Sequence, residues 1–237
     1  MSSYKRILFL GGSGRFGKVF KKINGNKNYF YPSSKELDNL DFEKINKYFK
    51  KNRPDLVIHC AGLSRPMEIH DSDINLSINL NIIGTCNMVK ACNKFNIKII
   101  YFSTCYVYPG KKGNYNENSP LLPVNNYAWS KLGGEAAVKL YKNSLIFRIS
   151  MTEKPFIHKK AFKDLITNFM FHEEVAKLLP KLYKFVGIIN IGGPSQSPYN
   201  FAKKFNPSIK GIKANKKKYL NKNFSMNIKK LKSLISG

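Results

Sequence analysis

The feature that most constrains this chain is the stretch from Leu8 to Gly17, which reads L-F-L-G-G-S-G-R-F-G. Its apolar run ends at glycines, and Gly11, Gly14 and Gly17 are spaced three residues apart. Glycines at this spacing permit a tight turn after a strand, let the backbone approach a pyrophosphate, and let the following helix pack closely on the strand. The free N–H groups of that helix then face an anion. We therefore expect a dinucleotide-binding turn, with an ordinary structural turn as the alternative.

Apolar segments alternate with helical segments along the first two thirds of the chain. We expect strands at residues 7–10, 29–31, 56–60, 97–103 and 145–149. Helices are expected near residues 15–23, 42–51, 73–95 and 126–141. Strands that are apolar throughout and separated by helices are typical of a parallel sheet covered on both faces. The predicted fold class is therefore α/β, a doubly wound parallel sheet of the Rossmann type.

The alternation of strands and helices weakens beyond Ser150. Residues 152–168 show no clear period, and later elements are expected at residues 173–184, 187–193, 199–205 and 226–235. A chain of 237 residues has room for one α/β domain with a modest addition, but not for two full domains. We predict an NAD(P)-binding domain over residues 1–150 and a small substrate-binding cap, packed on the same domain, over residues 151–237.

The formal net charge of +27 raises the question of a nucleic-acid partner. Most of the excess is lysine, and the chain has only five arginines, which make the commonest specific contacts to bases. We therefore expect no specific nucleic-acid partner and a lysine-rich surface suited to an anionic small substrate. Weak nonspecific binding stays open for residues 203–232, which contain no acidic residue.

Cysteine usage and the N-terminal sequence indicate the compartment. The four cysteines form no C-x-x-C pair and show no metal-ligand spacing, so we expect reduced thiols and no metal site. The N-terminus lacks a signal-peptide pattern, and no apolar run is long enough for a membrane span. These observations predict a cytoplasmic protein without a membrane span.

The residues about 20 positions after the glycine motif indicate the cofactor, because an acidic side chain there usually binds the adenosine ribose. Tyr31-Pro32-Ser33-Ser34-Lys35 stands at this place instead. Two hydroxyls and a lysine, together with Arg15 in the glycine turn, suit a 2′-phosphate. We therefore favour NADP (NADPH) over NAD, and the alternative is a polar turn without a cofactor role.

A tyrosine and a lysine four residues apart, Tyr127 and Lys131, share one face of a predicted helix. A nearby ammonium favours phenolate and lowers the pKa of a tyrosine from about 10. The same spacing recurs elsewhere, at residues 31 and 35, 108 and 112, and 199 and 203. Only the Tyr127 pair follows a strand that ends in hydroxyls, Ser103 and Thr104. A carbonyl-reducing site needs such a hydroxyl to hold the carbonyl oxygen and an acid to protonate it.

Five motifs together carry a resemblance to a known family. They are G-x-x-G-x-x-G at 11–17, R-P-D-L-V-I-H-C-A-G at 53–62, N-x-x-G-T at 81–85, F-S-T-C-Y-V-Y at 102–108 and Y-A-W-S-K-L-G-G-E at 127–135. The set resembles an extended short-chain dehydrogenase/reductase of the NAD-dependent epimerase/dehydratase superfamily. Within that superfamily it is similar to the dTDP-4-dehydrorhamnose reductase branch. The resemblance covers residues 7–149 well and residues 171–205 more loosely.

The resemblance implies roles for individual residues. Thr104 matches the family's active-site hydroxyl, Tyr127 its catalytic acid, and Lys131 the residue that binds the nicotinamide ribose and lowers the pKa of the tyrosine. Asp41 matches a residue that contacts adenine. Further implied cofactor contacts are Gly11, Gly14, Arg15, Phe16, Gly17, Ala61, Gly62 and Asn81. Implied substrate contacts are Ser103, Thr104, Cys105 and Tyr106.

The activity implied is NADP-dependent reduction of a nucleotide-diphosphate-linked 4-keto-6-deoxy sugar, with hydride delivered to C4 and Tyr127 as proton donor. A sugar-nucleotide epimerase, a non-catalytic NADP-binding regulatory subunit, and assembly as a homodimer stay open. A dehydratase fits less well, because Cys105 and Tyr106 supply no acidic pair after the hydroxyl. Two departures bear on the substrate: Cys105 replaces the branch's usual aspartate, and the segment between Arg148 and Phe171 is short. Cys105 could serve as an epimerisation base or as a small packed side chain.

Overall fold

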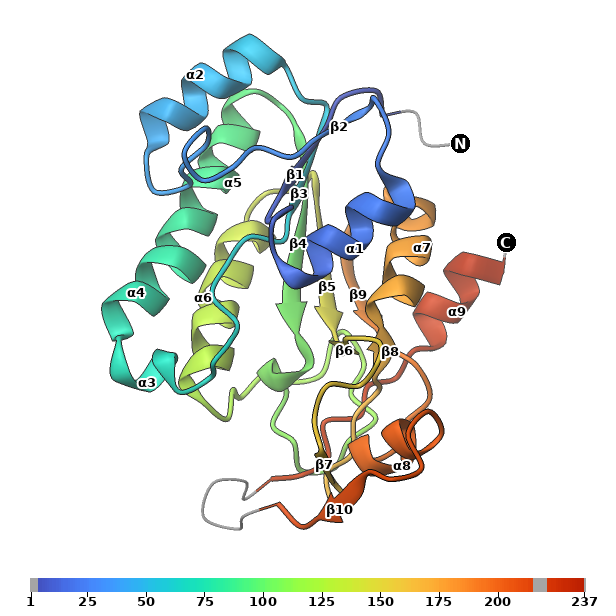
Figure 1. Ribbon diagram of the computed structural model, residues 1–237. Coiled ribbons are helices and arrows are strands. Elements are labelled where there is room, and N and C mark those ends of the chain that lie inside the picture. The colour runs from blue at the N-terminus through green and yellow to red at the C-terminus, as the bar shows by residue number, and fades with distance from the viewer. Residues whose placement is uncertain (1–3, 215–220, 237) are drawn as a thin grey trace.

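The computed structural model describes residues 4–214 and 221–236, and it is built on one six-stranded sheet with the strand order β2-β1-β3-β4-β5-β9 (Figure 1). Every neighbouring pair in this sheet is parallel. The strands are β1 (Ile7–Leu10), β2 (Tyr29–Phe30), β3 (Leu56–His59), β4 (Lys98–Thr104), β5 (Ser144–Ile149) and β9 (Gly187–Ile191). This arrangement confirms the prediction of a doubly wound parallel sheet of the Rossmann type.

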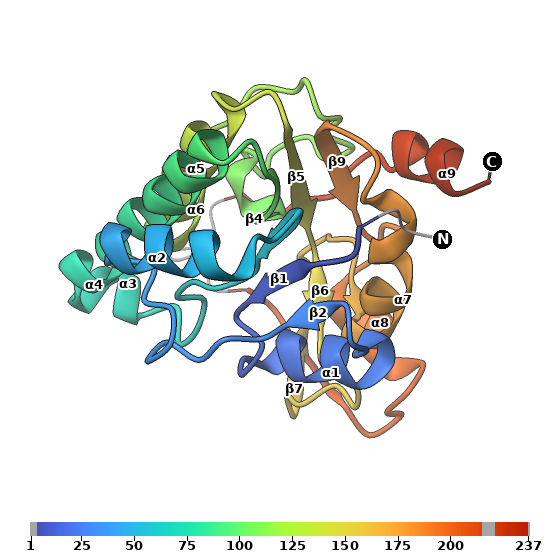
Figure 2. The same ribbon diagram turned by 90° about the horizontal axis from the view of Figure 1, so that it is seen from above.

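Helices cover both faces of the sheet, as the view from above shows (Figure 2). One face carries α1 (Arg15–Asn24), α7 (His172–Leu182) and α9 (Lys229–Ser236). The other carries α2 (Phe42–Asn52), α5 (Gly84–Lys94) and α6 (Asn126–Lys139). Successive residues of a strand point to opposite faces, so Ile7 and Phe9 pack into the first core while Leu8 and Leu10 pack into the second. This double burial explains why the strands are apolar throughout.

The long helix expected over residues 73–95 is interrupted by a wider turn. It begins as α4 (Ile74–Ile78), passes through a π-helical turn at Asn79–Ile83, and continues as α5. Turns of this type occur often at functional sites, because they redirect a side chain without ending the helix. Here the redirected side chain is that of Asn81, which is buried.

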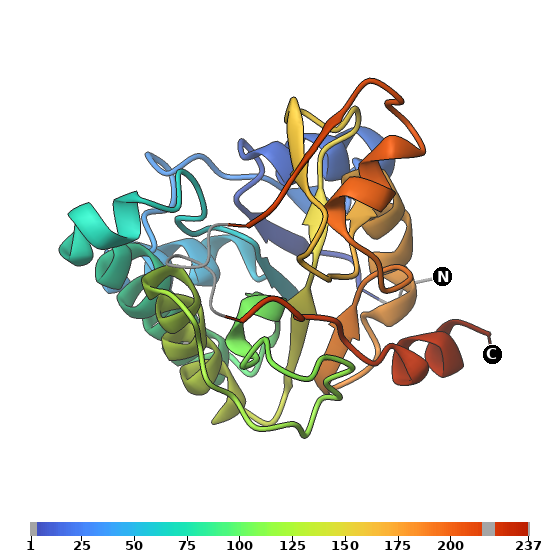
Figure 3. The same ribbon diagram turned by 90° about the horizontal axis from the view of Figure 1, so that it is seen from below.

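The residues after Ser150 supply both the last strand of the sheet and several small elements. Two short pairs form, β6 (Met151–Thr152) with β8 (Met170–Phe171) and β7 (Lys160–Phe162) with β10 (Lys210–Ile212). The helix α8 (Pro198–Lys203) packs on β7. Seen from below, these elements gather at the end of the sheet toward which β4 and β5 point (Figure 3). Strands of two or three residues carry too little periodicity to be predicted from the sequence.

Two further short elements lie near the same end of the sheet. They are the helix α3 (Ile69–Ser72) and a 3-10 turn at Cys105–Val107 directly after β4. Across residues 4–214 and 221–236, none of the helices combines the length and the apolar composition that a membrane crossing requires.

Candidate active site

A cleft of about 490 Å³ opens at the carboxyl ends of the central strands. This is where ligands bind in open parallel sheets. Most of the site residues predicted from the sequence line it. They are Gly11, Gly14, Arg15, Phe16, Gly17, Ser34, Ala61, Gly62, Ser103, Thr104, Cys105, Tyr106, Tyr127 and Lys131.

The glycine turn after β1 has the geometry that a dinucleotide diphosphate requires. Gly11 has a φ of +88°, and a Cβ atom there would lie 2.9 Å from the backbone nitrogen of Ala61. A Cβ atom on Gly17 would clash with the carbonyl oxygen of Gly11. The helix α1 begins after Gly14, and no side chain caps its N-terminus. Its first N–H groups are thus available to an anion in the cleft.

Tyr127 lies in the first turn of α6 and meets Thr104 at the end of β4. The cap of α6 is Asn125, whose Oδ1 accepts a hydrogen bond of 2.8 Å from the backbone N–H of Ala128. The ring of Tyr127 also packs against His70, with centroids 5.2 Å apart. Burial raises the pKa of Tyr127 to about 12, although the hydrogen bond with Thr104 lowers it. The phenol is therefore protonated at neutral pH.

Lys131 lies one turn further along α6 and is only 7 % exposed. Its ammonium lies 4.2 Å from the centroid of the Tyr101 ring. Burial lowers the pKa of Lys131 to about 8, while Cys60 and Glu135 act in the opposite direction. The pKa of Tyr127 lies above its ordinary value, because burial of the phenol outweighs the hydrogen bond with Thr104 and the positive charge of Arg65. That Lys131 lowers the pKa of this tyrosine stays a prediction.

Asn81 does not line the cleft but fixes the loop that follows β3. Its Oδ1 accepts from the backbone N–H of Leu63 at 2.7 Å, and its Nδ2 donates to the carbonyl oxygen of Leu63 at 2.9 Å. The same Nδ2 donates to Ser130 Oγ at 2.8 Å. Asn81 therefore ties the backbone beside Ala61 and Gly62 to α6, and it acts on the cleft through that backbone.

A buried polar network supports the hydroxyl end of β4 from behind. Ser103 Oγ donates to Glu135 Oε2 at 2.5 Å, and Arg148 Nη2 donates to Glu135 Oε1 at 2.7 Å. Arg148 Nη1 also donates to Tyr108 Oη at 2.9 Å. The Ser103 hydroxyl is thus already engaged, which leaves Thr104 as the hydroxyl beside Tyr127.

Cys105 lines the cleft but is only 2 % exposed. Its Sγ lies 4.0 Å from Thr167 Oγ1. Burial raises the pKa of Cys105 to about 11, so the group is a thiol at neutral pH. This environment favours a small packed side chain over a thiolate base.

Only one of the cofactor-binding residues predicted after β2 lies in the lining of the cleft. Ser34 lines the cleft, whereas Ser33, Lys35 and Asp41 do not. Ser33 Oγ donates to Glu36 at 2.8 Å, and Asp41 caps α2 by accepting from the backbone N–H of Lys44 at 2.9 Å. These two side chains serve local turns, which a sequence motif cannot distinguish from ligand contacts. Three neighbours that were not predicted, Pro32, Leu37 and Asn39, line the cleft instead.

Sequence reasoning predicted Arg15 but missed its charged partners in the cleft wall, Arg65 and Glu153. Arg15 and Arg65 both contact Glu153, and His172 lies close to them on α7. The Nη2 of Arg15 donates to Ser64 Oγ at 3.3 Å, so this side chain reaches the loop after β3. The available signal was position: Arg15 and Arg65 each stand five residues after the end of a predicted strand, near the edge where ligands bind in open parallel sheets.

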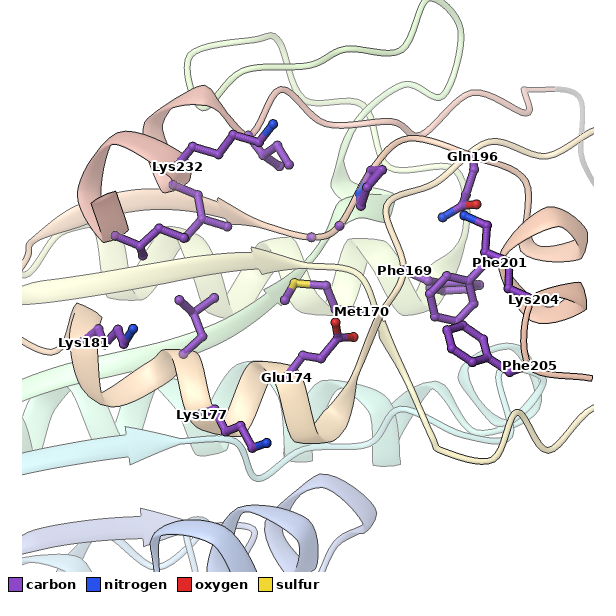
Figure 4. Close-up of a pocket in the computed structure, with 17 residues that line it drawn as sticks. Phe169, Met170, Glu174, Lys177, Lys181, Gln196, Phe201, Lys204, Phe205 and Lys232 are labelled. Carbon is purple, nitrogen blue, oxygen red and sulfur yellow. The ribbon is translucent and has the colours of Figure 1, made fainter. Parts of the chain in front are cut away.

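A second hollow, of about 560 Å³, lies between α7, α8 and α9 (Figure 4). Its floor is apolar, and lysines such as Lys177, Lys181 and Lys232 stand around it. Glu174 accepts a hydrogen bond from the backbone N–H of Phe171 at 2.7 Å and thus serves the start of α7. The hollow lacks the glycine turn and the tyrosine, so the cleft at the strand ends is the candidate active site.

Comparisons with known proteins agree with this geometry. The model of the family described as "RmlD substrate binding domain" matches residues 5–175. Methionine adenosyltransferase 2 subunit beta of Danio rerio is 30 % identical over 145 residues, which are 57 % of this chain and 44 % of that protein. A probable low-salt glycan biosynthesis reductase, Agl14 of Haloferax volcanii, is 30 % identical over 119 residues, which are 48 % of this chain and 39 % of that protein. The matched residues thus span less than half the length of these relatives.

Solved structures with the same fold come from several organisms. A hypothetical dTDP-4-dehydrorhamnose reductase from Sulfolobus tokodaii is 25 % identical, with a TM-score of 0.83 over 96 % of this chain and 94 % of that one. The dTDP-4-dehydrorhamnose reductase of Bacillus anthracis, in complex with NADP, is 22 % identical, with a TM-score of 0.82 over 94 % of this chain and 89 % of that one. The UDP-glucose 4-epimerase of Thermus thermophilus, in complex with NAD, is 17 % identical, with a TM-score of 0.74 over 98 % and 92 %.

Proposed function

Because the chain belongs to the family of the RmlD substrate binding domain, in the NAD-dependent epimerase/dehydratase superfamily, we propose that it is an NADPH-dependent reductase of a nucleotide-linked 4-keto-6-deoxy sugar. The observation that carries the proposal is the meeting of Thr104 and Tyr127 in the cleft onto which the glycine turn opens. A hydroxyl, a protonated phenol and an anion cradle in one cavity are the groups that carbonyl reduction with a dinucleotide needs.

The cleft suits a dinucleotide, because a Cβ atom at Gly11 or Gly17 would clash with neighbouring backbone, so only glycine permits the tight turn that lets backbone N–H groups approach a diphosphate. The N–H groups at the start of α1 would hold the diphosphate, and Lys131 would bind the nicotinamide ribose. When bound, NADPH supplies the hydride. NADP is proposed over NAD because the residues that line the cleft after β2, which are Pro32, Ser34, Leu37 and Asn39, include no carboxylate.

The protein's own contribution is to hold the substrate oxygen and to deliver a proton. The hydroxyls of Thr104 and Tyr127 would both bind the carbonyl oxygen at C4. The pKa of Tyr127, raised by burial to about 12, keeps the phenol protonated until negative charge develops on that oxygen. The proton then passes from Tyr127 Oη to the oxygen, and Arg65, which lowers the pKa of the phenol, stabilises the charge left behind.

We propose that the sugar nucleotide lies between the end of β4 and the small elements that follow Ser150. Cys105 and Tyr106 line the cleft on this side, together with Ser150 and Phe169. The division into a dinucleotide-binding part over residues 1–150 and a substrate cap over residues 151–237 belongs to this proposal.

The direct test incubates the full chain with dTDP-4-keto-6-deoxyglucose and NADPH and follows loss of NADPH absorbance. Turnover is expected, and Tyr127→Phe should lower the rate by about a hundredfold or more, in the range of general acid catalysis, while NADPH still binds. Leu140→Ala, on an exposed side chain directly after the end of α6, is the control and should keep the rate. Absence of turnover with every 4-keto sugar nucleotide tried would refute the reductase.

A non-catalytic regulatory subunit is the second candidate, because the relative from Danio rerio is named as a subunit beta. The same Tyr127→Phe variant separates the two. A regulatory subunit would bind NADPH and keep its effect on a partner after this change, whereas a reductase would lose its rate. A third candidate, epimerisation with Cys105 as base, is disfavoured by the raised pKa of that thiol.

A further inference from the structure

Two of the chain's five arginines meet on one carboxylate in the cleft wall. Arg15 Nε lies 3.3 Å from Glu153 Oε1, and Arg65 Nη1 lies 3.1 Å from the same oxygen. The Glu153 side chain is 15 % exposed, against 47 % for Arg15 and 35 % for Arg65. The three residues come from the turn after β1, the loop after β3 and the segment directly after β6, so only the fold brings them together.

Glu153 lines the same cleft as the glycine turn, and its partner Arg15 is the first residue of α1, whose N-terminus no side chain caps. A guanidinium presents the same fork of donors to a carboxylate and to a phosphate. We infer that Arg15 and Arg65 form a diphosphate-binding position and that Glu153 is its internal competitor, displaced when a diphosphate binds. The inference rests on the proposed function only in that both the cofactor and the substrate proposed there carry a diphosphate.

The charges around the site favour this exchange. Burial raises the pKa of Glu153, but its own backbone N–H, Arg65, His172 and Arg15 outweigh that effect and lower the pKa, so the carboxylate is charged. Burial lowers the pKa of His172, which is therefore neutral at neutral pH. Two positive charges thus face one negative charge. A diphosphate carries more charge than a carboxylate and matches the two arginines better.

An internal carboxylate also makes the site selective. A ligand must offer stronger hydrogen bonding and more charge than Glu153 to take its place, so a nucleoside or a monocarboxylate gains nothing from the two arginines. Glu153 follows Thr152, which pairs with Phe171 in the β6–β8 ladder. Release of Glu153 from the arginines therefore frees one link between the glycine turn and the segment after Ser150.

The first experiment measures binding of inorganic pyrophosphate by calorimetry to the full chain and to Glu153→Gln. Loss of two partly exposed ion pairs should tighten binding about three- to tenfold. Asp164→Asn is the matched control, because it makes the same change of charge at a carboxylate paired with Lys222 outside the cleft. Equal pyrophosphate affinity in the wild type and Glu153→Gln, or an equal gain in Asp164→Asn, would overturn the inference.

A second variant, with the opposite expected effect on pyrophosphate affinity, keeps the inference testable if Glu153→Gln has a folding defect. Arg65→Gln should weaken pyrophosphate binding, and in the double variant Glu153→Gln should bring a smaller gain than it does alone. A gain that is the same with and without Arg65 would show that Glu153 does not compete at this position.

Two nucleotide ligands identify the source of the diphosphate. If Glu153→Gln tightens the binding of NADP⁺ but not that of dTDP, the position takes the cofactor's diphosphate. If it tightens the binding of dTDP but not that of NADP⁺, the position takes the diphosphate of the sugar nucleotide. Unchanged affinity for both would refute the inference. None of these measurements needs turnover, so a chain that binds diphosphate as expected but reduces no sugar would refute the reductase alone.

Discussion

Arg148 Nη2 lies 2.7 Å from Glu135 Oε1, with the two side chains 3 % and 2 % exposed. This pair sits directly behind the active-site end of β4, because Glu135 also accepts the hydrogen bond of Ser103. A buried pair of this kind costs much when only one partner is removed, since the other charge is left unpaired in the interior.

Arg148→Met should therefore destabilise the protein by about 3–5 kcal/mol, because it strands the Glu135 carboxylate and removes a donor to Tyr108. The free energy of unfolding from urea titration measures the effect. The control is Lys44→Met, which removes the exposed ion pair with Asp41 and should cost less than about 1 kcal/mol. If Arg148→Met lowers the free energy of unfolding as little as the control does, the Arg148–Glu135 pair is not a buried ion pair in the folded protein.

The pKa of Lys131, lowered by burial to about 8, predicts pH-dependent cofactor binding. Lys131 is charged below this pH and neutral above it. If its ammonium binds the nicotinamide ribose, the affinity for NADPH should fall as the pH rises from about 7 to about 9. Tyr127, with a pKa near 12, and Cys105, with one near 11, do not titrate in that window. Fluorescence titration should show the fall in the wild type and a flat profile in Lys131→Met.

His59 predicts how stability responds to acid. Its Nε2 lies 3.0 Å from Thr85 Oγ1, and burial lowers its pKa from 6.5 to about 3. Between these values the unfolded chain binds a proton that the folded chain does not, so stability falls as the pH drops below 6.5. The contribution of one such histidine is about 1.4 kcal/mol per pH unit. Unfolding measured near pH 7 and near pH 5 should show a smaller loss for His59→Gln than for the wild type, and equal slopes would contradict the prediction.

Cys105 should react slowly with thiol reagents. The thiol is 2 % exposed and burial raises its pKa to about 11, so little thiolate forms at neutral pH. Cys86, which is only partly buried, is the internal reference within the same molecule. Mass spectrometry after brief alkylation should find Cys86 labelled well before Cys105. Preferential labelling of Cys105 would revive a role for it as a nucleophile or base.

The sheet could be predicted because its signals are local. Each central strand is an apolar run that ends at glycine, proline or polar residues, and burial on both faces requires no alternation. The short pairs β6–β8 and β7–β10 could not be predicted, since two or three residues carry no period and their partners lie far along the chain. The π-helical turn at Asn79–Ile83 was also missed, because it leaves the helical pattern of the sequence almost unchanged.

The sequence by itself determined the glycine turn, the order of strands and helices, and the approach of Thr104 to Tyr127, because each depends on spacing within one element or on the rule that parallel strands end at one edge. Only the tertiary structure decided that Arg15 and Arg65 meet on Glu153, and that Asp41 caps a helix instead of facing the cleft. It also decided the pKa values of Tyr127 and Lys131. The physical reason is that charge pairing and desolvation depend on which distant segments become neighbours, and no spacing along the chain records that.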